Sequence, residues 1–230
     1  VFVDINDDFN IDPDAIEKPI SHTLVGLEEI KNRVEEMGIS CFVAYNWQFS
    51  PIILRVKEIL AEALLGDLYY MRVSVGQDLR RWRSRDYKLC YSSKKDGGGG
   101  VMLDLVHDIN YPAWLLGESL HAKACVTRKL SDLEIDTEDF VESILESDSG
   151  VLVTVHQDYL RTPYDRSLEI SGSTASLTWN SEKNTIVVKN NDAVLVNESF
   201  DGRRDTMYED EVAFFVESLN GEKYINNIDE

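Results

Sequence analysis

Residues 139–160, DFVESILESDSGVLVTVHQDYL, decide the fold class, because two strand-like runs flank a tight turn. The runs at 139–145 and 151–160 are rich in valine, isoleucine and leucine, as strands with a buried face usually are. Between them, Asp148-Ser149-Gly150 has the composition of a turn. The stretch therefore predicts consecutive strands.

Further elements on both sides extend this pattern. Strand-like runs occupy 68–75, 167–179 and 185–196, a helix is predicted at 101–116, and a last helix at 208–219. Strands that follow one another in this way predict a mixed or antiparallel sheet with helices on one face. We assign residues 66–230 to this α+β unit.

The first 65 residues have a different rhythm. Strands are predicted at 1–5, 13–16 and 39–45, and helices at 23–37 and 50–65. Gly38 is placed to end the first helix, and Ser50-Pro51 to begin the second. Alternation of strands and helices predicts a parallel sheet covered by helices, so we place a domain boundary near residue 65.

The composition excludes several classes of partner. The 230 residues include 42 acidic and 23 basic side chains, and the formal net charge of −19 would repel nucleic acid and anionic membranes. No apolar run approaches the roughly 18 residues that span a bilayer. The three cysteines show no pairing typical of a disulfide framework or a metal site, which favours a reducing, cytoplasmic location. If the ligand is anionic, the arginines at 80, 81, 83 and 85 form the densest basic cluster.

A first candidate site segment is Glu17-Lys18-Pro19. A lysine after a strand lies at the carboxyl edge of a parallel sheet, where open α/β sheets bind their ligands. There its ammonium could donate to a substrate hydroxyl, and the proline would fix the following turn. Alone, such a tripeptide is more often an ordinary surface segment.

The second candidate segment is DGGGGVMLDLVHD, residues 96–108. In the helix predicted at 101–116, Asp104 and His107 would share one face, so that the carboxylate could orient the imidazole for acid/base work. The glycines would let the backbone approach a ligand closely. A flexible loop and a histidine buried in a core are the alternatives.

Taken together, these segments resemble the glucose-fructose oxidoreductase, inositol dehydrogenase and MocA-like (Gfo/Idh/MocA) family. The resemblance includes EKPISHTL at 17–24, VAYN at 43–46 with Phe49 and Pro51, the glycine run, Asp104, His107, and WLLG at 114–117. It covers residue 17 to the end of the chain. Gly76-Gln77, Trp82-Arg83 and the tyrosines near 87–91 resemble a branch linked to surface-polysaccharide and acylneuraminate-type sugar biosynthesis.

The resemblance implies an oxidoreductase that moves a hydride between NAD or NADP and a hydroxyl-bearing carbon of a sugar or sugar derivative. Catalysis would rest on Lys18, His107 as acid/base, and Asp104. The implied cofactor contacts are Glu17, Lys18, Pro19, Trp82 and Arg83, and the implied substrate contacts are Lys18, Tyr45, Asn46, Asp104 and His107. Residues 1–65 would be the remnant of a Rossmann domain, and 66–230 the substrate-binding and oligomerisation domain, of a homodimer or homotetramer.

The chain departs from the family pattern in several places. The step from Asp104 to His107 is three residues instead of the usual four, and Gln48 stands where an arginine is usual. No GxGxxG phosphate-binding turn is present, which predicts either a seam between Ile16 and Glu17, with part of a longer chain omitted, or a truncated protein.

Two other functions remain open at this point. One is a non-catalytic sugar-binding or regulatory protein that has lost the dinucleotide site. The other keeps the cofactor but uses transient oxidation to drive hydrolysis or elimination.

Overall fold

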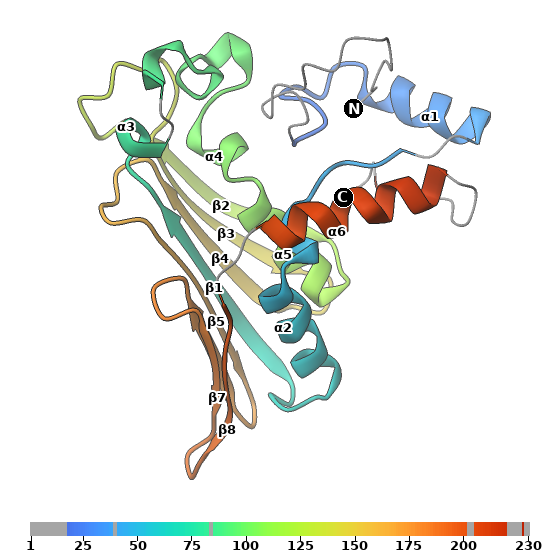
Figure 1. The fold of residues 1–230 in the computed structure, drawn as a ribbon, viewed down its shortest axis with the longest axis vertical. Coiled ribbons are helices and arrows are strands. Elements are labelled where there is room, and N and C mark those ends of the chain that lie inside the picture. The colour runs from blue at the N-terminus through green and yellow to red at the C-terminus, as the bar shows by residue number, and fades with distance from the viewer. Residues whose placement is uncertain (1–17, 39–40, 83–84, 202–204, 220–226, 228–230) are drawn as a thin grey trace.

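The fold is described by a computed structural model that covers residues 18–38, 41–82, 85–201, 205–219 and 227. Its main feature is an eight-stranded sheet in the order β2-β3-β4-β1-β5-β6-β7-β8 (Figure 1). The strands are β1 (Leu68–Gly76), β2 (Leu120–Arg128), β3 (Phe140–Ser147), β4 (Leu152–Asp158), β5 (Asp165–Gly172), β6 (Ser176–Asn180), β7 (Thr185–Lys189) and β8 (Val194–Ser199). β1 and β4 are parallel, whereas every other neighbouring pair in this sheet is antiparallel. The predicted mixed sheet is thereby confirmed.

The helices α2 and α5 lie on one face of the sheet (Figure 1). The helices are α1 (Leu27–Met37), α2 (Pro51–Ala61), α3 (Leu79–Trp82), α4 (Val101–Asp104), α5 (His107–Leu116) and α6 (Asp205–Leu219), with short 3-10 turns η2 (Asn46–Phe49), η3 (Tyr87–Leu89), η4 (Tyr91–Ser93) and η5 (Lys95–Gly97). The main core joins Ile53 of α2 and Tyr111 of α5 to Val73 of β1 and Val155 of β4. Successive strand residues point to opposite faces, so Arg72 and Thr154 lie on the face away from these helices.

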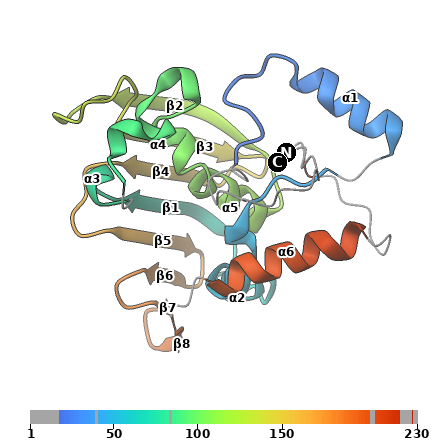
Figure 2. The same cartoon turned by 45° about the horizontal axis from the view of Figure 1, so that its top comes forward.

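A second, smaller core supports the carboxyl ends of β1 and β4, which both point toward α3 (Figure 2). It joins Val75 of β1, Leu79 of α3 and Val101 of α4 to Leu133 in the loop before β3 and to Tyr159. These side chains are buried, and they fix the short helices that follow the strands. The candidate site is built on this core.

The segments before β1 differ in part from the expectation. α1 begins at Leu27, later than predicted, after Gly26 with φ of 82°, and it ends at Gly38 as expected. α2 begins at Pro51 as predicted, but it ends at Ala61. Because α2 shares the main core with the sheet, the packing continues across the predicted boundary near residue 65, and the division into two domains stays a prediction.

Residues 42–45 do not form the predicted strand. Only Cys41 makes an isolated bridge, and the backbone of Val43 pairs with the side-chain amide of Asn227 through bonds of 2.7 and 3.0 Å. A side chain therefore satisfies the main-chain groups that a neighbouring strand would otherwise satisfy. The predicted strands at 1–5 and 13–16 and the seam at 16/17 lie outside the described residues.

The carboxyl-terminal strands follow the prediction, but the run at 167–179 is divided into β5 and β6, and the run at 185–196 is divided into β7 and β8. The last helix, α6, begins at Asp205, earlier than the predicted residue 208. β2 was not predicted. It is an edge strand that is exposed along nearly all of its length. Its sequence, LHAKACVTR, therefore lacks the regular apolar pattern that burial of one face imposes on a strand. α6 packs against η2, and the rings of Phe214 and Phe215 in α6 lie 5.8 and 5.6 Å from the ring of Phe42 between centroids.

Candidate active site

The helix predicted at 101–116 is interrupted in its middle. α4 ends at Asp104, Leu105 leaves the helical region with φ of −102° and ψ of 26°, and α5 begins at His107. Leu105 is buried in the smaller core, and its carbonyl oxygen accepts a 2.7 Å hydrogen bond from Gln157. The prediction of one continuous helix was therefore wrong. Asp104 and His107 are the last and first residues of two helices.

Lys18 and Asp104 meet in the structure although 86 residues separate them in the chain. The Lys18 ammonium donates a 2.8 Å hydrogen bond to the backbone carbonyl of Asp104, not to its carboxylate. The lysine is half-buried, and a cis peptide bond joins it to Pro19. The two sequence segments that suggested a site are thus neighbours in space.

The Asp104 side chain is buried and only partly satisfied. Its Oδ2 accepts a 2.5 Å hydrogen bond from the Tyr159 hydroxyl, while Oδ1 has no partner among the described residues. No hydrogen bond joins Asp104 to His107 in the described part of the chain, so the expected orientation of the imidazole by this carboxylate is not seen. A buried carboxylate oxygen without a donor is costly, and a ligand hydroxyl could satisfy it.

His107 occupies the amino-terminal end of α5, with 9% of its surface exposed. Burial lowers its pKa well below the ordinary value, and the positive charges of Lys18 and Arg166 lower it further. The imidazole is therefore neutral at pH 7. Its Nδ1 has no hydrogen-bond partner within the described residues, and the ring of Tyr45 lies edge-on at 6.1 Å between centroids.

Asp108, the residue after His107, forms a buried ion pair. Asp108 accepts a 2.9 Å hydrogen bond from Arg166 of β5, and the side chains are 0% and 6% exposed. The Arg166 guanidinium also lies 4.1 Å from the centre of the Trp47 ring. This pair anchors the first turn of α5 to the sheet. Sequence reasoning missed it, because a lone aspartate and an arginine 58 residues apart carry no pattern.

The other residues expected to contact cofactor or substrate differ in how directly they adjoin Asp104 and His107. Tyr45 packs on His107, whereas Asn46 is buried in η2 with its Oδ1 lacking a partner in the described chain. Gln48 donates a 3.0 Å hydrogen bond to Asn110 of α5. Trp82 reaches the site indirectly, with its ring 5.8 Å from that of Tyr159. Glu17 and Arg83 lie outside the described residues.

The glycine run makes close contacts with the protein itself. A Cβ atom on Gly99 would lie 2.2 Å from the carbonyl oxygen of Tyr91, and one on Gly100 would lie 2.4 Å from the carboxylate of Glu138. Gly100 also has φ of 114°, a conformation that other residues rarely adopt. These two glycines are therefore required by internal packing, whereas the sequence had suggested close approach to a ligand.

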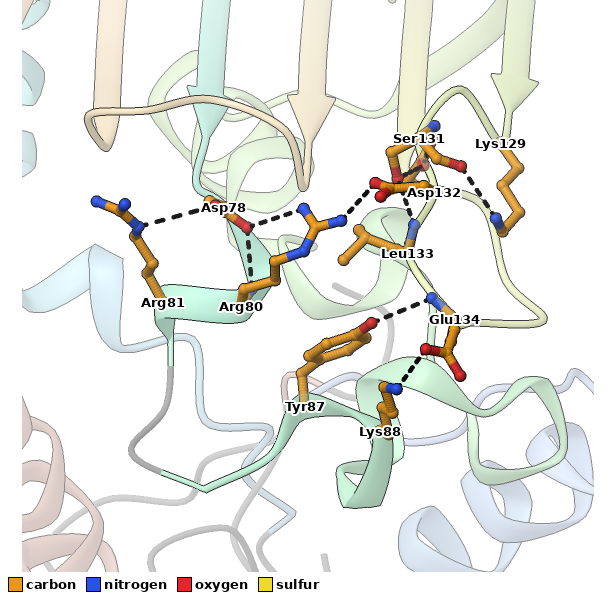
Figure 3. A network of polar contacts seen from close by, with 11 residues as sticks. Asp78, Arg80, Arg81, Tyr87, Lys88, Lys129, Ser131, Asp132, Leu133 and Glu134 are labelled. Atoms are coloured by element: carbon orange, nitrogen blue, oxygen red, sulfur yellow. Dashed lines mark hydrogen bonds and ion pairs between the residues drawn. The ribbon is translucent and has the colours of Figure 1, made fainter.

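The basic cluster near residue 80 is engaged in surface ion pairs (Figure 3). Arg80 pairs with Asp78 and Asp132, Arg81 lies 3.9 Å from Asp78, and Lys88 pairs with Glu134. The Tyr87 hydroxyl accepts a hydrogen bond from the backbone amide of Glu134. The contacts tie α3 and η3 to the loop that precedes β3. They neutralise two of the arginines that had been candidates for an anionic ligand.

Comparison with known proteins agrees with this fold. The sequence model of the GFO/IDH/MocA C-terminal domain matches residues 53–178, more than half of the chain. The chain belongs to the GFO/IDH/MocA family, as the sequence segments had suggested.

The relatives found are distant. The chain is 23% identical to the uncharacterized oxidoreductase YrbE of Bacillus subtilis, over 88% of this chain and 60% of that protein. It is also 23% identical to myo-inositol 2-dehydrogenase of Thermotoga maritima, over 75% of this chain and 50% of that enzyme. The chain thus spans about half to three-fifths of the length of these relatives.

Among solved structures, levoglucosan dehydrogenase in complex with NADH and L-sorbose has a similar fold. The TM-score is 0.74 at 20% identity, with 89% of this chain and 63% of that chain covered. No helix in the described residues is both long and apolar enough to cross a membrane. Nor do those residues include a group of three histidine, cysteine, aspartate or glutamate side chains that could hold a metal ion.

Proposed function

We propose that this chain is the substrate-binding part of an oxidoreductase that transfers a hydride between NAD or NADP and a hydroxyl-bearing carbon of a sugar or sugar derivative. The observation that carries this proposal is the meeting of Lys18 with the Asp104–His107 segment. It brings a cation, a neutral imidazole and a carboxylate oxygen without a partner to one place. A polyhydroxylated substrate can use all three groups.

Each side chain has a distinct part in the proposed reaction. The neutral imidazole of His107 accepts the proton of the reacting hydroxyl, which its lowered pKa allows at pH 7. The Lys18 ammonium donates to the same oxygen and stabilises the negative charge that develops on it. Asp104 accepts a hydrogen bond from a neighbouring hydroxyl through Oδ1 and so orients the sugar.

The described residues fit the nicotinamide end of the cofactor. Buried polar atoms without partners among the described residues at Asp104 and His107 support a ligand at this place, with Lys18 beside Asp104. Lys18 and Pro19 are proposed contacts of the cofactor. Trp82, beside Tyr159, is a further proposed contact, and Glu17 and Arg83 complete the proposed cofactor set. When bound, the nicotinamide supplies the acceptor or donor of the hydride.

The names of the relatives support a sugar or polyol as the substrate. One is named for myo-inositol oxidation, and the levoglucosan dehydrogenase structure holds NADH together with L-sorbose. For this chain we propose a small-molecule substrate of that class and a cytoplasmic location. Tyr45, Asn46 and Asp104 are the proposed substrate contacts besides Lys18 and His107.

Calorimetry tests the proposal directly. The full-length protein should bind NAD or NADP, and sugar-dependent reduction should appear as a rise in nicotinamide absorbance. Titration of both dinucleotides with no heat of binding would overturn the proposed function. Dinucleotide binding without any net absorbance change during turnover would instead favour transient oxidation, and sugar binding without dinucleotide binding would favour a regulatory protein.

We also propose that the chain forms a homodimer or homotetramer through the face of the sheet away from α2 and α5. On this face the apolar side chains of Val126, Ile144 and Leu152 are 41 to 45% exposed. We expect Ile144→Glu to convert the oligomer to a monomer, because it places a charge in a buried contact. Light scattering after size-exclusion chromatography measures the mass.

Leu130→Glu is the matched control, since Leu130 is equally apolar and 59% exposed but lies in the loop after β2. It should leave the mass unchanged. A wild-type protein that is monomeric at micromolar concentration contradicts the proposed assembly.

A further inference from the structure

We infer that Gln157 and Tyr159 form a clamp that holds the interruption between α4 and α5 and thereby positions Asp104 and His107 against Lys18. The inference rests on the proposed function for its catalytic meaning. Its structural content is independent of that function. Gln157 lies near the end of β4 and Tyr159 follows the strand directly. Neither touches a reacting atom in the proposed mechanism, so they are positioning residues.

Gln157 is the first half of the clamp. It is completely buried, and its Nε2 donates to the carbonyl oxygen of Leu105 at 2.7 Å and to that of Met102 at 3.5 Å. Leu105 is the residue at which the helix is interrupted. A buried side-chain amide that caps this carbonyl compensates for the irregular backbone around it.

Tyr159 is the second half. It follows β4 directly, two residues after Gln157, and its hydroxyl donates to Asp104 Oδ2 at 2.5 Å. Burial and the charge of Asp104 raise the pKa of Tyr159 well above its ordinary value, so the hydroxyl keeps its proton and remains a donor. Trp82 packs on the ring, and the backbone amide of Tyr159 donates to Asp139 at 2.9 Å.

The clamp bonds made by Gln157 and Tyr159, together with the Lys18 bond, determine how three oxygen atoms of Asp104 are used. Oδ2 is occupied by Tyr159, the backbone oxygen is occupied by Lys18, and Oδ1 is left for a ligand. They also keep the carboxylate from turning toward His107. Asp104 and His107 are only three residues apart in the chain. Because Gln157 and Tyr159 hold the turn between them, both side chains can still contact the ligand in the proposed site.

The test compares Tyr159→Phe with Tyr70→Phe. Each substitution removes one hydroxyl from a tyrosine bonded to a carboxylate, but Tyr70 bonds Glu169 at 2.9 Å on the opposite face of the sheet. The readout is the NMR titration of the His107 imidazole in the full-length protein, which needs neither cofactor nor substrate. His107→Asn assigns the signal among the histidines.

In Tyr159→Phe the released Asp104 carboxylate can approach His107, where Lys18, Arg166 and Asp108 are the other charged groups. We expect the titration midpoint of His107 to rise toward the ordinary value by about one pH unit. Tyr70→Phe should leave it unchanged. A mere loss of stability would lower the melting temperature without moving the midpoint in the folded protein.

Gln157→Met provides a second variant, because methionine keeps the chain length but cannot donate to Leu105. It should move the His107 midpoint in the same direction. A folded Tyr159→Phe or Gln157→Met protein with the wild-type midpoint overturns the clamp. If the midpoint moves but no dinucleotide binds, the clamp stands and the proposed function fails.

Discussion

Arg166→Met lowers the free energy of unfolding by about 3–5 kcal/mol, the loss expected when a buried charge loses its partner. Asp108 is completely buried, and the 2.9 Å contact with Arg166 is the ion pair that compensates its charge. The substitution also removes the guanidinium stacked on Trp47. Chemical denaturation followed by fluorescence measures the effect.

The control for this prediction is a surface ion pair of the same length. Arg55 of α2 contacts Glu198 of β8 at 2.9 Å, but both side chains are partly exposed. Arg55→Met should cost about 1 kcal/mol or less. Equal decreases in the free energy of unfolding for the two variants would show that burial does not increase the contribution of the Asp108–Arg166 pair to stability. The double variant Arg166→Met/Asp108→Leu should recover part of the loss, because no unpaired charge remains.

His107→Asn and Lys18→Met each lower kcat/KM for sugar-dependent reduction of NAD(P) by about 100- to 10,000-fold in the full-length protein. The first removes the proposed proton acceptor, and the second removes the cation proposed to stabilise the developing alkoxide. The activity of the wild-type protein should persist below pH 6.5, because the lowered pKa keeps His107 neutral there, and it should fall only in stronger acid.

Matched substitutions on β2 separate this effect from general damage. His121 and Lys123 are exposed and pair with Asp148 and Glu146. His121→Asn and Lys123→Met should retain wild-type activity. If the His107 and Lys18 variants remain as active as these controls, the assignment of the site is wrong.

The sequence was informative wherever burial imposed a regular pattern. The strand β1, the strands β3 and β4 and the turn between them belong to a sheet with one buried face, and they were predicted. β2 was not predicted, because an exposed edge strand has no such pattern. The strand expected at 39–45 was suggested by apolar residues that instead pack against α6 and η2, as Phe42 does.

The sequence identified two segments that lie together in the structure, but it did not predict the contacts that join them. Lys18 and His107 could be chosen from their segments, and the structure places both segments together. The break at Leu105 depends on Gln157 and Tyr159, which lie more than 50 residues later. No local pattern encodes a contact over that distance. The same holds for Asp108 and Arg166.

The parallel pairing of β1 with β4 also has a consequence for the order in which the chain folds. Both neighbours of β1 come much later in the sequence, since β4 begins at Leu152 and β5 ends at Gly172. During synthesis, the backbone hydrogen-bonding groups on both edges of β1 therefore stay unpaired until about a hundred further residues have been made. Pairing between segments so far apart in the chain is intrinsically slow. We expect nascent chains that end before β4 to need chaperones, because β1 precedes the other seven strands of the sheet and has no neighbour until β4 and β5 follow.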